Sequence, residues 1–170
     1  MKVIFLDIDG VLNTSIYSQH YFAIAKLRGL SHEQAKVLAK KEIRDEFGIL
    51  FDPFAVNCLR WIIDRTKAKI VISSTWRYSG LNQMQLMWEM RNLPGEVIDI
   101  TPNYSEIAGT CRGDEIADYC KENSIDSYII LDDMPDMLPH QINNFVMLDP
   151  HYGITRKDVE LCVKILNQNE

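Results

Sequence analysis

Five short runs of apolar residues recur along the chain, and each is rich in residues that favour β-strands. Runs of four or five residues are too brief for a stable helix and indicate strands that are buried on both faces. Such strands are typical of parallel sheets. The predicted strands are Lys2–Leu6, Lys69–Ile72, Glu96–Ile100, Tyr128–Leu131 and Phe145–Leu148.

The segments between these runs carry apolar residues at the spacing of an amphipathic helix. In the last of them the helical repeat extends from Val159 to Leu166, and Thr155 is the expected N-cap. Helices are predicted over Pro53–Arg65, Leu81–Arg91, Asp114–Glu122 and Arg156–Asn167. The alternation predicts an α/β fold of three layers, a Rossmann-like open parallel sheet of five strands with helices on both faces.

Residues 13–50 depart from this simple alternation. The string from Ser31 to Gln34 has the form of a capping box and predicts a helix that runs to about Phe47, with Gly48 at its end. Tyr17–Leu27 is a second candidate helix. We expect a small helical insertion, or minimal cap, over the carboxyl-terminal edge of the sheet, where ligands bind in such folds. Residues 1–170 then form a single domain that contains this insertion.

The first predicted strand ends abruptly in Asp7-Ile8-Asp9-Gly10. Two carboxylates this close repel each other, and partial burial adds to the energetic cost. A bound Mg2+ removes that cost because hard cations prefer carboxylate oxygens, and Gly10 lets the chain turn directly after the pair. The competing interpretation, two exposed aspartates in a turn, leaves the rest of the string unexplained.

Three hydroxyl residues, Ser73, Ser74 and Thr75, follow the second predicted strand. Hydroxyls and free backbone N–H groups at such a place can hold phosphate oxygens. Arg77 can add a planar, permanently charged guanidinium. Taken alone, the hydroxyls fit equally well the ordinary beginning of a helix after a strand.

Arg112 precedes the third of these predicted helices. A cation there can neutralise both a nucleophile and a phosphate, although it can also be a surface residue paired with Asp114 or Glu115.

A further strand ends in the adjacent acids Asp132 and Asp133, and Asp136 follows. One of them can complete a metal site shared with the acids of the first strand. The ordinary alternative is an acidic N-cap of a short helix.

Composition adds limits rather than a function. The net charge of −6 argues against binding along a nucleic-acid backbone, which needs clustered Lys and Arg, but it allows a phosphorylated small molecule or a nucleic-acid end.

The four cysteines lack zinc-site spacing and are expected to be reduced. We find no signal peptide and no apolar stretch long enough to span a membrane, so we expect a cytoplasmic protein without a membrane partner. The oligomeric state is left open.

Two of the three tryptophans, Trp61 and Trp88, are expected in the core. Trp76 lies beside the second polar stretch, where it can pack in the fold or stack on a ring of a substrate.

The four polar stretches, in this order, resemble the four motifs of the haloacid dehalogenase (HAD) superfamily. Asp7 to Leu12 matches its first motif, D-x-D-G-(T/V)-L. The second motif, a strand that ends in Ser or Thr, is matched by Ser73 or Ser74, and the third, a Lys or Arg, by Arg112. The fourth motif, an acidic pair or D-x-x-x-D, is matched by the pair Asp132 and Asp133 or by Asp132 and Asp136.

The resemblance can be narrowed to the HAD domains of Swiss Army Knife RNA-repair proteins. The strings that carry it are Phe5–Asn13, Ile72–Arg77, Arg112–Ile116 and Leu131–Asp133. That family implies work on nucleic-acid ends. The chain departs from the superfamily pattern in two respects: Arg112 replaces the commoner Lys, and the usual cap is absent unless residues 13–50 supply it.

The resemblance implies a Mg2+-dependent phosphohydrolase that acts through an aspartyl-phosphate. Asp7 is implied to attack phosphorus, and Asp9 to protonate the leaving oxygen and then to deprotonate the attacking water. Ser74, or its neighbour Ser73, is implied to hold a phosphoryl oxygen while Arg112 balances charge. The implied ligands of Mg2+ are Asp7, Asp9 through its backbone carbonyl, and either Asp132 or Asp133.

Two other functions fit the same residues. One is a phospho-recognition module that binds metal but turns over little or nothing, although such a binder has no need for the second acid, Asp9. The other is a phosphorylation-switched receiver domain, although receivers place the acid pair and the phosphorylated aspartate on different strands. The substrate of a phosphohydrolase is not specified by these residues, and both a nucleic-acid end and a small phosphorylated metabolite fit.

Overall fold

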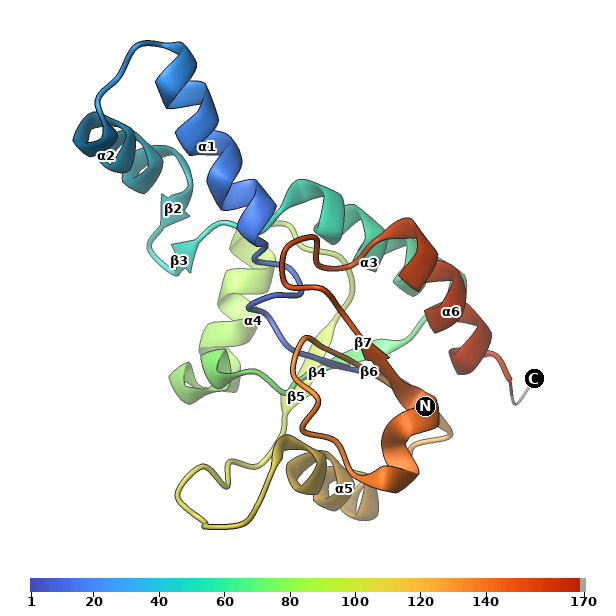
Figure 1. The fold of residues 1–170 in the computed structure, drawn as a ribbon. Coiled ribbons are helices and arrows are strands. Elements are labelled where there is room, and N and C mark those ends of the chain that lie inside the picture. The colour runs from blue at the N-terminus through green and yellow to red at the C-terminus, as the bar shows by residue number, and fades with distance from the viewer. Residues whose placement is uncertain (169–170) are drawn as a thin grey trace.

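The five predicted strands pair side by side in one parallel sheet (Figure 1). Their order is β5-β4-β1-β6-β7, so β1 lies at the centre between β4 and β6. The computed structural model describes residues 1–168. The strands are β1 (Lys2–Leu6), β4 (Lys69–Ile72), β5 (Val97–Ile100), β6 (Ser127–Asp132) and β7 (Phe145–Met147).

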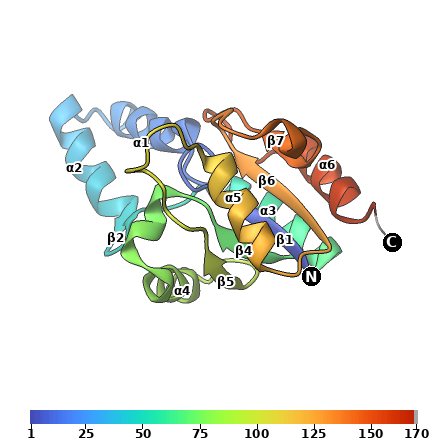
Figure 2. The same cartoon turned by 90° about the horizontal axis from the view of Figure 1, so that it is seen from below.

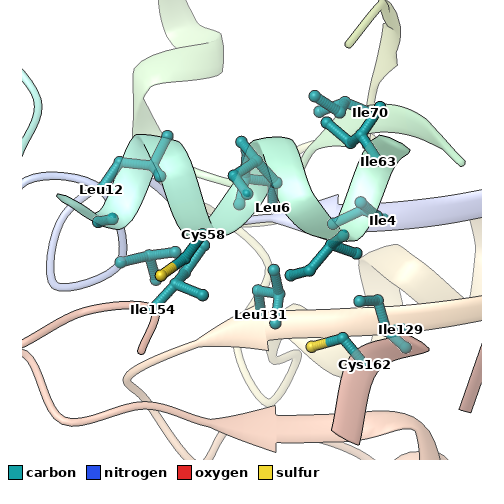
Figure 3. Close-up of a cluster of buried hydrophobic side chains, with 14 of the residues drawn as sticks. Ile4, Leu6, Leu12, Cys58, Ile63, Ile70, Ile129, Leu131, Ile154 and Cys162 are labelled. Atoms are coloured by element: carbon teal, nitrogen blue, oxygen red, sulfur yellow. The ribbon is translucent and has the colours of Figure 1, made fainter. Parts of the chain in front are cut away.

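Helices cover both faces of the sheet, as the sequence predicts (Figure 2). One face packs against α3 (Pro53–Thr66) and α6 (Arg156–Leu166), with α4 (Leu81–Met90) toward the β5 edge. The other face packs against α5 (Arg112–Glu122). Figure 3 shows Leu6 and Leu131 of the sheet among side chains from α3 and α6, including Cys58 and Cys162.

Side chains alternate between the two faces along each strand. Ile4 and Leu6 of β1 point toward α3, whereas Phe5 points toward α5 and lies between two tyrosine rings, Tyr119 and Tyr128, each with its centroid 5.6 Å away. The same alternation carries Asp7, which follows the strand, to the α5 face.

The predicted insertion consists of two helices and a small hairpin. Its elements are α1 (Ser15–Leu27), α2 (His32–Glu42), β2 (Arg44–Asp45) and β3 (Gly48–Ile49). The two helices pack against each other and extend away from the sheet (Figure 1). The capping box is confirmed, because the N–H of Ser31 donates to Gln34 Oε1 (2.8 Å) and the N–H of Gln34 to Ser31 Oγ (3.2 Å).

The predicted end of the second insertion helix, near Phe47, is wrong. Helix α2 ends at Glu42, and the chain turns into the β2–β3 hairpin. One local and one tertiary contact favour this turn, because Asp45 accepts the backbone N–H of Phe47 (2.9 Å) and two hydrogen bonds from Arg91 (2.8 and 2.7 Å). A side chain that captures its own backbone competes with the helix.

The expectation for Trp61 is also wrong, while that for Trp88 is confirmed. Trp61 is 38 % exposed, and the guanidinium of Arg156 lies 5.3 Å from its ring centroid. Trp88 is buried, and its indole N–H donates to the carbonyl of Pro94 (2.8 Å). A residue at helical spacing on an amphipathic helix can lie at the border of the apolar stripe, and Trp61 does so.

The four cysteines are free thiols, with Cys58 and Cys162 buried. Burial raises the pKa of the Cys58 thiol to about 11 and that of Cys162 to about 12, so both behave as apolar core residues. Among residues 1–168, no helix is long and apolar enough to cross a membrane.

Candidate active site

Asp7 lies directly beyond β1, between the ends of β4 and β6. Its backbone N–H donates to the carbonyl of Leu131 (3.0 Å), and the residue is only 6 % exposed. Arg112, the first residue of α5, faces it: Nη1 lies 2.9 Å from Asp7 Oδ1 and 3.1 Å from Asp132 Oδ2. Arg112 therefore points into the site instead of pairing on the surface with Asp114, whose carboxylate caps α5.

Three carboxylates converge at this point. Ligand oxygens of Asp7, Asp132 and Asp133 all lie within 4.8 Å of one another. Asp132 is fully buried; its Oδ1 accepts the N–H of Met134 (2.9 Å), and its Oδ2 contacts Arg112 without the alignment of a hydrogen bond. The arrangement is suited to a hard divalent cation.

Burial dominates the electrostatics of this group. It raises the pKa of Asp132 to about 7, against the opposing pull of the Arg112 charge. Burial and then the neighbouring charge of Asp7 raise the pKa of Asp133 as well. Burial acts to lower the pKa of Arg112, but the attraction of Asp132 and Asp7 outweighs it and raises that pKa. Arg112 therefore stays protonated, and its single charge does not offset the effect of burial on the two acids.

The loop after β1 closes tightly over Asp133 because Gly10 has no side chain. Gly10 adopts a φ of 77°, and a Cβ there would lie 2.5 Å from Asp133 Cγ. Only glycine permits both the left-handed backbone and the close approach. Gly10 therefore serves both as the predicted turn residue and as the point where the loop after β1 packs against Asp133.

Asp9 lies outside the three-carboxylate group. Its side chain is exposed at the surface, where Oδ1 accepts a hydrogen bond from Asn13 Nδ2 (2.8 Å) and Oδ2 accepts one from Trp76 Nε1 (2.9 Å). The two acids of the first stretch, two positions apart in sequence, therefore occupy different environments.

The two candidate serines are both buried, but their hydroxyls differ. Ser74 Oγ accepts the N–H of Trp76 (3.4 Å) and caps the short helix η1 (Thr75–Ser79). Ser73 Oγ has no hydrogen-bond partner in the described chain. Thr101, which follows β5 beside Ser73, likewise has a buried hydroxyl without a partner.

Arg77, a possible phosphate ligand by sequence, is paired within the fold instead. Its guanidinium is buried against Glu115 of α5 (2.7 Å) and donates to the carbonyl of Ser74 (3.1 Å). Arg77 therefore ties the second stretch to the helix that carries Arg112. No phosphate-binding role follows from this position.

Asp136 is separate from the acidic group. It is exposed, and its backbone carbonyl accepts the N–H of Gly113 at the start of α5 (2.9 Å). The adjacent pair Asp132 and Asp133, not Asp136, lies beside Asp7.

Sequence reasoning missed several partners in the site: the two donors to Asp9, the role of Glu115 and the hydroxyl of Thr101. Asn13 and Trp76 both stand in strings that carry the family resemblance, so a signal was present. Glu115 also stands in such a string, Arg112–Ile116, but its pairing with Arg77 is not readable there because the two residues are 38 positions apart. Nothing in the sequence marks Thr101.

Comparison with known protein families gives one match. A family model described as the HAD domain in Swiss Army Knife RNA repair proteins matches residues 3–159. No curated protein and no solved structure matches the chain. The matched span contains the four polar stretches and the five strands of the sheet except for Lys2, the first residue of β1. The chain therefore belongs to the family of HAD domains found in Swiss Army Knife RNA repair proteins.

Proposed function

We propose that the protein is a Mg2+-dependent phosphomonoesterase that acts through an aspartyl-phosphate on Asp7. Membership of the HAD family implies a phosphohydrolase-type function. The observation that carries the finer proposal is the contrast between Asp7 and Asp9. One is buried against a guanidinium and two acids, and the other is exposed and held by two neutral donors. Different environments allow two carboxylates to take different roles.

Asp7 is the nucleophile in this proposal. Its carboxylate attacks phosphorus, the bond to the leaving oxygen breaks, and the phosphoryl group is transferred to the Asp7 oxygen. Asp9 gives a proton to the departing oxygen and later takes one from the water that attacks the aspartyl-phosphate. The exposure of Asp9 suits this role, since both the leaving group and the water must reach it.

The three-carboxylate group fits a divalent cation. Three negative charges face the single positive charge of Arg112, which leaves two uncompensated when all three acids are ionised. Asp132 Oδ2 is buried without a hydrogen bond. Asp7, Asp132 and Asp133, with the backbone carbonyl of Asp9, would hold Mg2+. When bound, the ion supplies charge compensation for the nucleophile and the phosphate.

We assign the phosphoryl-binding hydroxyl to Ser73 in preference to Ser74. The Ser73 hydroxyl is buried without a partner among residues 1–168, on the sheet face toward which Asp7 points, whereas that of Ser74 already caps η1. A buried donor without a partner is costly unless a ligand satisfies it. Arg112, charged under all ordinary conditions, balances the charge of the phosphate beside Asp7.

The proposed substrate is a phosphorylated nucleic-acid end or a small phosphorylated metabolite. The name of the matched family points to RNA repair, while a net charge of −6 disfavours binding along a polynucleotide backbone. A nucleic-acid substrate would then be held chiefly at its terminal phosphate.

Thermal unfolding tests the metal. In metal-free protein the pKa of Asp132 is about 7, above its ordinary value of 3.8. The folded state therefore holds the carboxyl proton of Asp132 more tightly than the unfolded state does. The free energy of unfolding then falls as the pH rises from the ordinary pKa to the raised one. Mg2+ binds the ionised acids. At a hundredfold excess over Kd it should add about 2.7 kcal/mol, a rise in Tm of roughly 5–10 °C at about pH 7.5, and much less at about pH 5.

Asp132→Asn is the control for this experiment. It should remove the Mg2+-dependent rise in Tm and flatten the loss of stability with pH. An equal rise at both pH values, or a rise that survives in Asp132→Asn, contradicts the proposed metal site.

Substitution of the two acids tests the chemistry. Asp7→Asn should lower phosphate release by roughly three orders of magnitude or more, and Asp9→Asn by about 10²–10⁴, with the Mg2+-dependent rise in Tm retained in Asp9→Asn. Release is measured from an aryl phosphate and from 3′- and 5′-phosphorylated oligonucleotides, with and without EDTA.

Asp136→Asn, an exposed acid outside the site, is the matched control and should keep wild-type activity. Full activity of Asp7→Asn would reject the nucleophile. Loss of the metal effect in Asp9→Asn would make its side chain a ligand. Metal binding without phosphate release from any substrate would favour the recognition module.

Alanine substitutions of Ser73 and Ser74 test which hydroxyl binds phosphate and which one stabilises the fold. Ser73→Ala should weaken competitive inhibition by inorganic phosphate by about tenfold, since a hydrogen bond to a charged group contributes about 1.5–3 kcal/mol. Ser74→Ala should leave that inhibition nearly unchanged and lower the free energy of unfolding by about 1 kcal/mol through loss of the cap. The reverse pattern would return the role to Ser74.

A further inference from the structure

Arg91, directly after α4, joins the core to the insertion. Its Nε and Nη2 donate to the Asp45 carboxylate in the β2–β3 hairpin (2.8 and 2.7 Å). Its guanidinium carbon lies 4.6 Å from the ring centroid of Phe51 and 6.0 Å from that of Trp76. The Arg91 side chain is only 6 % exposed. A guanidinium that is stacked and paired in this way is held in one position.

Trp76 is fixed by this arrangement. Its ring is half-buried, with its centroid 5.6 Å from that of Phe51. On another side lies Gly48, where a Cβ would be in ordinary contact with Trp76 Cη2 at 3.6 Å. The ring is thus bounded by the hairpin, by Phe51 and by Arg91. Its one polar atom, Nε1, is directed at Asp9 Oδ2.

The two donors to Asp9 differ in what they are attached to. Asn13 belongs to the same loop, four residues further along. Trp76 belongs to the segment after β4, 67 residues away in sequence, and is packed against the core. The Trp76 bond therefore ties the Asp9 carboxylate to a different segment of the core, the one that follows β4.

We infer that Trp76 is a positioning residue for Asp9, held in place by the ion pair between Arg91 and Asp45. The inference rests on the proposed role of Asp9 as proton donor. An exposed carboxylate on a loop samples several rotamers, and a rigid N–H donor restricts them to the productive one. The insertion then contributes to catalysis through its hairpin, by supporting the tryptophan that orients the acid.

Leaving-group dependence provides the test. A poor leaving group such as ethanol needs a proton as it departs, whereas 4-nitrophenolate departs without one. We compare kcat/KM for ethyl phosphate and 4-nitrophenyl phosphate, because it reports the step that expels the leaving group. Trp76→Phe should lower the value for ethyl phosphate at least about tenfold more than the value for 4-nitrophenyl phosphate, part of the about 10²–10⁴ available from general acid catalysis.

Three further variants sharpen the result. Trp61→Phe, an exposed tryptophan that stacks with Arg156, should leave the ratio of the two kcat/KM values unchanged. Asp45→Asn should shift the ratio in the same direction as Trp76→Phe. If urea unfolding shows that Trp76→Phe is not folded, replacement of Trp76 by benzothienylalanine keeps the ring shape and removes only the N–H donor.

Two results overturn different claims. If wild-type protein hydrolyses both substrates and loss of the indole N–H affects them equally or not at all, Trp76 is merely structural and the inference is wrong. If wild-type protein with Mg2+ hydrolyses neither substrate and no phosphorylated oligonucleotide, the proposed function itself is wrong.

Discussion

Negative charge gathered at the ends of β1 and β6 is the constraint on which the rest of the site depends. The carboxylates of Asp7, Asp132 and Asp133 lie within 4.8 Å of one another, and Asp132 has no exposure to solvent. Such a group is unfavourable unless positive charge is brought to it. Arg112 supplies one positive charge, and burial still raises the pKa of Asp132 to about 7 against the opposing effect of that charge. The proposed divalent cation would supply the remaining positive charge.

Much of the surrounding structure serves to hold Arg112 at that position. Glu115, one turn along α5, is paired with Arg77 and accepts the backbone N–H of Tyr104 (2.9 Å). On the other side, Gln141 donates to the carbonyl of Gly113 (2.8 Å), where a Cβ would lie 2.6 Å from the backbone nitrogen of Leu138. The first turn of α5 is thus fixed from both sides, and this keeps Arg112 beside the three acids.

The strands and most helices follow from the sequence because local patterns determine them. The runs at Lys2–Leu6 and Lys69–Ile72 are too apolar and too short to be anything but buried strands, and parallel pairing brings their polar ends to one edge. Asp7 and Asp9 are recognisable as a pair because both follow the apolar run that forms β1. Their separation into two environments is not recognisable, because Arg112 and Trp76 reach them from more than 60 residues away.

Two of the departures from expectation have a common physical origin. Local pattern extends a helix to Phe47 and leaves Arg77 free to enter the site, yet Arg91 and Glu115 hold these residues elsewhere through contacts distant in sequence. Ser73 and Ser74 are equivalent in sequence and differ only in which hydroxyl finds a partner. Propensity and motif spacing do not encode such tertiary competition.

A crystal structure grown with Mg2+ and a phosphate analogue tests the central claim most directly. The account predicts one ion about 2.0–2.1 Å from carboxylate oxygens of Asp7 and of Asp132 or Asp133, with Arg112 still beside Asp7. Saturating Mg2+ with no ion bound among these three acids would contradict it.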